Sequence, residues 1–384
     1  MKVMIMGMDG YLGWALSMYL ADRGHDVCGV DNMTRRKTVA EIGGWSAIPI
    51  KSMRERLGAY KEVSGKELVF YYGDLKEASF VDLVVKKEEP ECIVHLGEIP
   101  SAPYSMIDVQ HCNYTQVNNV IGHNNILFAI KDNVPDCHLL KLGTMGEYGT
   151  PNLDIPEGFF EIEYRGRKDK LPFPRQPGSW YHLTKVHDTW NLMFANKIWG
   201  IRATDVMQGV VHGLDTPQMI NDNLLTRFDF DEVFGTAINR FCAQAVIEHE
   251  LTPYGKGGQT RGYLAIRDSM QCFTIAIENP PKEREYRVFN QFEETYSANE
   301  LANRVSKVSQ EYGLEGKIWN IPNPRIEAEE HYYKPDMKNL PNLGFKPKKT
   351  LEEELHITIP KLMEHKNRIE AKRATISPKI KWAD

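Results

Sequence analysis

The stretch Lys2-Val-Met-Ile-Met-Gly7-Met-Asp-Gly10-Tyr-Leu-Gly13 decides the fold. A short apolar run, typical of a buried strand, leads into three glycines at spacings of three. Glycines here let the backbone turn tightly and approach a pyrophosphate, whose charge lies at the N-terminus of the next helix. We predict a dinucleotide-binding turn, the alternative being a strand–turn–helix that merely favours glycine. The candidate cofactor residues are Gly7, Asp9, Gly10, Tyr11, Leu12 and Gly13.

Acidic residues at the next strand ends support a dinucleotide. Asp31 ends the second apolar run, eighteen residues after Gly13. A carboxylate there binds the adenosine ribose hydroxyls and disfavours a 2′-phosphate, which predicts NAD rather than NADP. Arg35 and Arg36 lie nearby and argue against that preference. Asp74 ends the third run, where it could meet the adenine amino group. Further cofactor candidates at these ends are Asn32, Arg35, Leu75 and Leu96.

Apolar runs alternate with helical patterns through the first 150 residues. The runs cover residues 2–6, 26–30, 68–72, 92–96 and 138–142. Parallel strands that are buried on both faces read as such continuous runs. We therefore predict an α/β fold in which residues 1–208 form a doubly wound, Rossmann-like parallel sheet. Residues 209–384 are richer in turn residues and predict a smaller α/β substrate domain, with some segments returning to the first domain.

Composition excludes several classes of protein. The chain has 384 residues and is 42% hydrophobic, enough to bury a core. Its net charge of −5 gives no basic field for nucleic acid. The absence of an 18-residue apolar run and of a signal-peptide pattern predicts no membrane insertion. Six cysteines without a CxxC predict a reduced, cytoplasmic protein, and no cluster supports a metal. The last 19 residues hold six Lys or Arg and two acidic residues. This composition predicts a solvated tail, the alternative being an arm that binds a partner.

A second motif, Tyr181-His-Leu-Thr-Lys185, carries candidate chemistry. Tyrosine and lysine four residues apart share one helix face. An ammonium beside a phenol lowers the pKa of that phenol, so Tyr181 could act as the base for an alcohol that loses hydride. Lys185 could also hold the nicotinamide ribose. Thr144 ends a fifth strand, where its hydroxyl points into the crevice of an open sheet and can bond the same substrate oxygen. An ordinary surface Tyr/Lys pair is the alternative.

These motifs resemble the extended short-chain dehydrogenase/reductases that act on nucleotide sugars. Longer strings resemble the UDP-sulfoquinovose synthases from the first strand to about residue 333. These strings are HLGE and SAPYSMID from His95, KLGTMGEYGTPNLDI from Lys141, YHLTKVHD from Tyr181, GIRATDVMQGVVHG from Gly200, FGTAINRFC from Phe234, YGKGGQTRGYL from Tyr254 and PNPRIEAEEHYY from Pro322.

The resemblance implies an enzyme that converts UDP-glucose and sulfite to UDP-sulfoquinovose with internally recycled NAD. Tyr181 would take the C4 proton while hydride passes to NAD, and a 4-ketone and a 4-keto-5-ene would follow before sulfite adds at C6. The implied substrate residues are Gln208, Arg261 and Arg325 along the nucleotide, and Tyr254 could close over the uracil. Sulfite needs an anion-tolerant pocket with several donors, for which Ser101, Tyr104, Ser179 and His182 are the candidates. Asn119 is expected to orient the cofactor side of the site. The chain has Ile99-Pro100 where the plant enzymes have Gln-Arg, so sulfite recognition departs from the family.

The residues after Thr144 argue against a plain 4,6-dehydratase. Such dehydratases carry Thr-Asp-Glu here, and their Asp and Glu transfer the C6 and C5 protons. This chain has Met145 and Gly146 at those positions, and neither can transfer a proton. The remaining candidates are Glu147, for which a structural carboxylate is an equal alternative, and His182.

Rival functions stay open on the sequence. A UDP-glucose 4-epimerase or 4,6-dehydratase needs much of the same residue set, and a non-catalytic NAD-binding regulator needs only the cofactor half. The helical stretches 116–130 and 181–199 could pair with their copies in a homodimer, as relatives commonly do; a buried intramolecular helix is the alternative for the first.

Overall fold

The computed structural model describes residues 1–214 and 216–382. Its main layer is a seven-stranded sheet in which every neighbouring pair is parallel. The strands in order are β11 (Tyr286–Gln291), β8 (Arg202–Gln208), β5 (His138–Thr144), β4 (Cys92–His95), β1 (Lys2–Met6), β2 (Asp26–Asp31) and β3 (Val69–Tyr72). The strand order reverses between β1 and β4, where such sheets bind ligands at the carboxyl ends of the strands. The predicted doubly wound α/β fold is confirmed.

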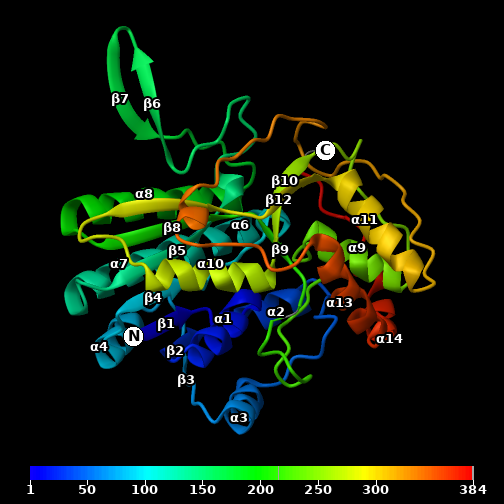
Figure 1. Ribbon diagram of the computed structural model, residues 1–384, viewed down its shortest axis with the longest axis horizontal. Coiled ribbons are helices and arrows are strands. Elements are labelled where there is room, and N and C mark those ends of the chain that lie inside the picture. Colours follow the sequence, from blue (N-terminus) through cyan, green and yellow to red (C-terminus); the bar gives the residue numbers. More distant parts are fainter. Residues whose placement is uncertain (215, 383–384) are drawn as a thin grey trace.

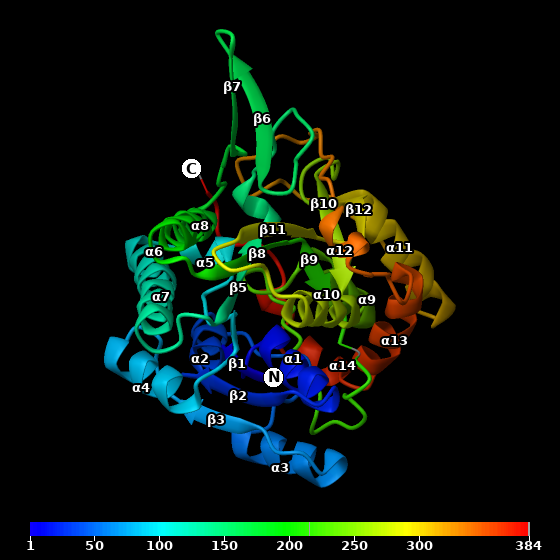
Figure 2. The same ribbon diagram turned by 60° about the vertical axis from the view of Figure 1, so that its left-hand side comes forward.

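Helices cover both faces of this sheet (Figure 2). One face carries α4 (Ala78–Glu88), α7 (Gly122–Asn133) and α8 (Trp180–Trp199), and the other carries α1 (Tyr11–Asp22) and α10 (Ile266–Glu278). Apolar side chains of each helix set pack with those of the strands into separate buried clusters. The interior-facing strand residues are almost completely buried, as two covered faces require.

A smaller unit begins directly after β8. Its sheet is β12 (Glu294–Ser297), β10 (Thr260–Ala265) and β9 (Val210–His212), with β9 parallel and β12 antiparallel to β10. Its larger helices are α9 (Ala237–Val246), α11 (Ala298–Glu311) and α13 (Leu351–Met363). Between these elements the chain returns to the large sheet through α10 and β11, so the two units are interleaved in sequence. The boundary at residues 208/209 stays a prediction.

The remaining elements are short. They are α2 (Thr34–Glu41), α3 (Met53–Ser64), α5 (Ala102–Ser105), α6 (Val109–Gln116), the π-helix η1 (Val117–Ile121), η2 (Met145–Glu147), α12 (Asn339–Asn342), α14 (Lys366–Glu370) and η3 (Arg373–Thr375). The expected helix 116–130 is therefore the end of α6, a π-helical turn and most of α7. The antiparallel hairpin of β6 (Phe159–Tyr164) and β7 (Arg167–Pro172) projects from the body in both ribbon views (Figures 1 and 2).

The C-terminal segment lies against the body of the protein. The solvated tail, one of the two interpretations of its charge, is therefore not what the structure shows. The backbone N–H of Trp382 donates to the Pro324 carbonyl at 3.0 Å. Ile380 packs against an apolar cluster that includes Ile99 and Phe234. The segment after η3 therefore runs back across the molecule. Among the described residues, no helix is long and apolar enough to cross a bilayer.

Candidate active site

The turn between β1 and α1 is shaped for close approach of a ligand. Gly7 has φ +96°, which favours glycine, and a Cβ on it would lie 2.8 Å from the Gly97 backbone. A Cβ on Gly13 would overlap the Gly7 carbonyl. The first turn of α1 therefore presents backbone N–H groups without side chains in front of them, which fits a pyrophosphate at the helix N-terminus.

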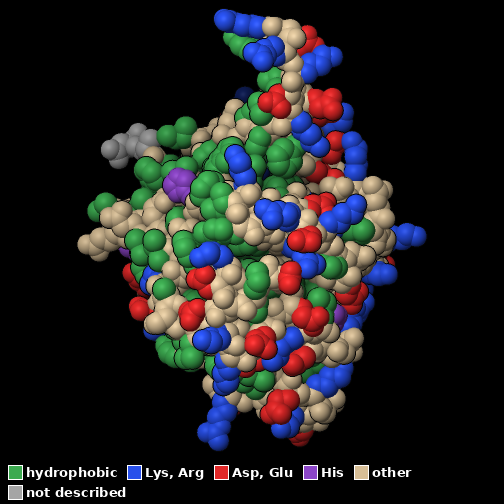
Figure 3. All heavy atoms as spheres, turned by 90° about the vertical axis from the view of Figure 1, so that its left-hand side faces the viewer, with side chains coloured by type: hydrophobic (Ala, Val, Ile, Leu, Met, Phe, Trp, Pro, Cys, Tyr) green, Lys and Arg blue, Asp and Glu red, His purple; other side chains and the backbone are tan. Residues whose placement is uncertain are grey.

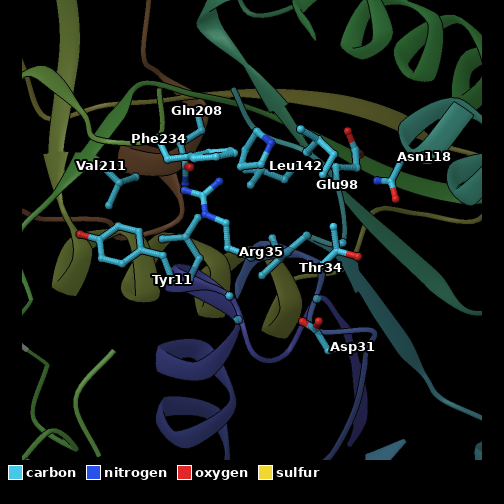
Figure 4. A pocket seen from close by; sticks show the side chains of 18 of the residues that line it. Tyr11, Asp31, Thr34, Arg35, Glu98, Asn118, Leu142, Gln208, Val211 and Phe234 are labelled. Carbon is cyan, nitrogen blue, oxygen red and sulfur yellow. The ribbon is translucent and has the colours of Figure 1, made fainter. Parts of the chain in front are cut away.

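Asp31 ties the second strand end to this turn. Its Oδ2 accepts a hydrogen bond from the Asp9 N–H at 2.9 Å, and its Oδ1 accepts one from the Met33 N–H at 2.7 Å. Burial, reinforced by the neighbouring Asp9 carboxylate, raises the pKa of Asp31 to about 6. The carboxylate lies in the cleft wall, where a ribose would meet it (Figure 4).

The Asp9 side chain points away from the cleft, contrary to a direct cofactor contact. Its carboxylate accepts two hydrogen bonds from Arg36, at 2.7 and 2.6 Å, and one from Arg56 at 2.8 Å. Arg56 is itself buried and stacks on the Trp14 ring at 4.1 Å. Asp9 thus anchors the turn from behind, because its buried carboxylate is fully occupied by guanidinium groups.

The two arginines that weakened the preference for NAD are both paired with carboxylates. Arg36 pairs with Asp9, and Arg35 donates to Asp229 Oδ2 at 3.0 and 2.8 Å. Arg35 also lies 4.0 Å from the Phe234 ring centroid, within the cleft (Figure 4). Neither guanidinium is left as an unpaired cation for a 2′-phosphate.

A single cleft brings most of the predicted residues together at the carboxyl ends of the strands. Those that line it are Gly7, Gly10, Tyr11, Leu12, Gly13, Asp31, Asn32, Arg35, Asp74, Leu75, Leu96, Thr144, Tyr181 and Gln208. Sequence reasoning missed other lining residues, including Glu98, Asn118, Phe234, Thr236 and Asn239. Glu98 had a signal, since it is an acidic residue that closely follows a buried apolar run.

Tyr181 and Thr144 both face the cleft, with Lys185 buried next to them. Thr144 Oγ1 accepts a hydrogen bond from the Gly146 N–H at 3.1 Å, which leaves its own hydroxyl hydrogen to donate to a substrate oxygen. Lys185 Nζ donates to the Leu142 carbonyl at 2.6 Å and lies 2.6 Å from Glu98 Oε2. The lysine is therefore held rigidly between a carbonyl and a carboxylate.

The groups of the protein raise the pKa of Tyr181, whereas the sequence predicted that Lys185 would lower it. Burial raises the pKa of the phenol, and the carboxylates of Glu98 and Glu147 raise it further. The positive charge of Lys185 is offset by Glu98, so it does not stabilise a phenolate as an isolated ammonium would.

Glu147 lies behind the cleft in a buried ion network. Its Oε1 lies 3.3 Å from Lys141 Nζ, and its Oε2 accepts a hydrogen bond from Thr189 Oγ1 at 2.9 Å. Lys141 also lies 3.2 Å from Asp205, and all these groups are buried. This placement fits the structural alternative for Glu147, because its oxygens are occupied and do not reach the cleft.

The His182 ring fills the space beside Gly146. A Cβ on Gly146 would overlap His182 Nε2. His182 Nδ1 lies 3.1 Å from Ser179 Oγ, and the ring centroid lies 5.1 Å from that of Tyr181. Burial, with the positive field of Arg325 and Arg261, lowers the pKa of His182 to about 3, so the imidazole is neutral at neutral pH. The ring lies beside Tyr181, which lines the cleft, but His182 is not itself among the lining residues.

Three predicted contact residues hold the cleft wall rather than line it. Ser101 Oγ donates to the Val233 carbonyl at 2.6 Å and caps α5. The Tyr104 hydroxyl donates to Glu41 at 3.0 Å, in a second hollow that shares Asn32 and Asp74 with the cleft. Asn119 bonds the Ile99 backbone through both its amide oxygen and its amide nitrogen. Each side chain is buried and occupied by protein partners.

The predicted nucleotide-binding cations lie beyond the described cleft, in the smaller unit. Arg261 donates to Glu327 at 2.7 Å and also to His331. Arg325 lies 5.8 Å from the Tyr254 ring centroid. The charges of both arginines act on His182 and lower the pKa of its imidazole.

Comparison with known proteins gives a consistent assignment. Residues 3–290 match the family model described as the NAD dependent epimerase/dehydratase family. The chain is 50% identical to the chloroplastic UDP-sulfoquinovose synthase of Spinacia oleracea, over 99% of this chain and 79% of that protein. It is 47% identical to the UDP-sulfoquinovose synthase of Sulfolobus acidocaldarius, over 100% of this chain and 98% of that protein.

The fold also matches solved structures. The UDP-glucose 4-epimerase of Bifidobacterium longum, solved with NAD+ and UDP, superposes with a TM-score of 0.72 at 16% identity, covering 98% of this chain and 100% of that one. Sequence and fold agree, and the chain belongs to the NAD-dependent epimerase/dehydratase family, in the branch that contains the UDP-sulfoquinovose synthases.

Proposed function

We propose that this protein is an NAD-dependent enzyme that converts UDP-glucose and sulfite to UDP-sulfoquinovose. The observation that carries the proposal is the near-full-length identity of about half to two UDP-sulfoquinovose synthases from distant organisms. The glycine turn, Asp31 and the Thr144/Tyr181 pair in one cleft support the same chemistry.

The residues would act in a defined order. The turn at Gly7–Gly13 and Asp31 hold the cofactor, and Lys185 is placed to meet its nicotinamide ribose. NAD, when bound, supplies the group that takes up a hydride and later returns it. Tyr181 accepts the proton of the C4 hydroxyl, while the Thr144 hydroxyl donates to the same oxygen. The resulting 4-ketone acidifies the C5 hydrogen. Loss of the C5 proton and of the C6 hydroxyl, which takes up a proton and leaves as water, would give the 4-keto-5-ene to which sulfite adds at C6.

His182 is the group we propose for the proton transfer at C5. Met145 and Gly146 cannot carry it, and Glu147 is buried away from the cleft. The neutral imidazole is the form that accepts a proton, and Ser179 fixes its orientation through the 3.1 Å contact with Nδ1. Because Gly146 has no side chain, the His182 ring has room to lie against its backbone.

Sulfite would be received at the same end of the cleft. Pro100 lines the cleft where the plant enzymes have arginine and offers no guanidinium. We propose that Arg261 and Arg325 supply the positive field instead, since both act on His182. Their cationic side chains suit the diphosphate of the sugar nucleotide as well.

A labelling experiment tests the function directly. The purified protein is incubated with UDP-glucose, NAD and ³⁵S-sulfite, and the sugar nucleotides are separated. We expect label in a UDP-sugar. Formation of UDP-galactose without label would instead identify a 4-epimerase, and unlabelled UDP-4-keto-6-deoxyglucose would identify a 4,6-dehydratase; either result would contradict the proposal.

We further propose a homodimer joined through α7 and α8. Large apolar side chains gather on this face of the molecule (Figure 3). On η1 and α7 they are Val117, Ile121 and Phe128, and on α8 they are Trp190, Phe194 and Ile198, each at least 42% exposed. The α8 residues recur every four positions and so form one stripe.

We also propose that the protein works in the reducing cytoplasm. All six cysteines are free thiols and five of them are buried, which supports this location.

A further inference from the structure

The segment after β4 presents one buried acid that the reaction scheme above does not use. Glu98 lines the cleft, yet only 2% of its side chain is exposed (Figure 4). Its backbone is fixed against the cofactor turn, because the preceding Gly97 lies against Gly7 with no room for a Cβ on either glycine. The carboxylate is therefore held at a set depth beside the cofactor site.

Lys185 and His95 hold this carboxylate from opposite ends. Glu98 Oε2 lies 2.6 Å from Lys185 Nζ, and Glu98 Oε1 lies 3.1 Å from His95 Nε2. The His95 ring is fully buried and stacks on His123 with centroids 5.4 Å apart. Burial alone would raise the pKa of Glu98, but Lys185 and His95 outweigh it and keep the pKa below its usual range. Glu98 is thus an anion throughout the neutral range.

We propose that Glu98 is a positioning residue: it fixes the Lys185 ammonium beside the cofactor and sets the charge balance around the Tyr181 phenol. The inference rests on the proposed function, since it assigns a role within that reaction. Among the described residues, the Lys185 ammonium has one partner besides Glu98, the Leu142 carbonyl, so without the carboxylate its long side chain gains rotational freedom.

The charges around Tyr181 decide the sign of the expected effect. The charged or titratable groups that act on it or lie beside it are Glu98 after β4, Lys141 on β5, Glu147 on η2, and His182 and Asp188 on α8, with Lys185 one turn further along the same helix. Glu98 is the strongest of the charges that act on Tyr181 and raises the pKa of the phenol. Its removal lowers that pKa and also releases the Lys185 charge to act on the phenol in the same direction.

The test compares Glu98→Gln and Glu98→Asp with the wild type. Hydride transfer is followed as the absorbance change of bound cofactor in a single turnover with UDP-glucose from pH 6 to 9, and NAD affinity is measured by calorimetry. We expect Glu98→Gln to move the acid limb of the rate profile down by about one pH unit. Glu98→Asp keeps the charge but shortens the reach, so its acid limb should stay in place while NAD binds several-fold more weakly.

Glu88→Gln is the matched control, because Glu88 is also a nearly buried carboxylate paired with a lysine, 2.8 Å from Lys2, on the far side of β1 from the cleft. It should leave the profile unchanged. An unmoved acid limb in a folded Glu98→Gln protein overturns the proposal. If that variant does not fold, wild-type NAD affinity and rate in Glu98→Asp overturn it instead. Sulfite labelling by the wild type is a separate readout, so failure of the proposed function is distinguishable.

Discussion

At the scale of single residues, Gly146 makes room for the imidazole that we assign to the C5 proton. In Gly146→Ala the new methyl group overlaps His182 Nε2, so the ring must turn out of its place. We expect sulfite incorporation to fall at least tenfold, while single-turnover cofactor reduction by UDP-glucose persists, because Tyr181 and Thr144 are untouched.

Gly178→Ala serves as the control for this substitution, since a Cβ there meets no atom within 4 Å. It should retain wild-type incorporation. Loss of cofactor reduction in Gly146→Ala to the same degree as incorporation would show that the substitution damages the hydride step and would count against the role of His182.

Asp31 gives a pH dependence to cofactor binding at the residue scale. Its pKa is raised to about 6, so the carboxylate that would bind the ribose hydroxyls is ionised above this pH and protonated below it. NAD affinity is therefore expected to be constant from pH 7 to 8 and to fall as the pH drops through 6. Calorimetric titration measures it, and Asp31→Asn should bind NAD more weakly with a flat profile in this range.

At the scale of elements, the segment 377–382 bonds to two loops of the smaller unit and contacts the large unit through Ile380, whose apolar cluster includes Ile99. Glu232 on one side accepts hydrogen bonds from the backbone of Lys379 and Ile380, and Trp382 on the other bonds Pro324 and lies 5.4 Å from Arg325. The segment thus reaches both the apolar cluster of Phe234 and the arginine that we assign to the sugar nucleotide.

Removal of residues 377–384 is expected to raise the KM for UDP-glucose at least fivefold, because Arg325 loses its aromatic support. NAD affinity should change little, since in the described part of the segment no residue hydrogen-bonds to the glycine turn or to Asp31. Steady-state kinetics and calorimetry measure the two quantities. Ser377→Ala, on an exposed residue of the same segment, is the control, and an unchanged KM in the truncated protein would contradict the prediction.

At the scale of the whole molecule, the apolar stripe on α8 predicts the oligomeric state. Trp190→Asp with Phe194→Asp places two charges in this stripe, where burial against a second copy would cost several kcal/mol. We expect the wild type to be a dimer and the double variant a folded monomer by light scattering. Ile220→Asp, at a residue 64% exposed in the loop after β9, should remain a dimer.

The large parallel sheet could be predicted from the sequence because its signals are local. A strand buried on both faces is a continuous apolar run, and a turn such as Gly7–Gly13 needs glycine at fixed spacing, so both are visible without contacts. The return of β11 to the sheet could not be located from the sequence, since nothing in its six residues specifies pairing with β8, where Tyr286 lies opposite Ala203, 83 residues earlier in the chain. Pairing of β11 with β8 is a long-range contact.

The site divides in the same way. The sequence by itself determined that a glycine turn, Asp31, Thr144 and the Tyr181/Lys185 pair are present, because each chemistry needs those residue types at strand ends or at helical spacing. Only the tertiary structure decided where the charges go: Asp9 turns to Arg36 and Arg56, Glu147 to a buried network, and Lys185 to Glu98. Buried charges must be paired, and the partners come from distant elements that no local pattern records.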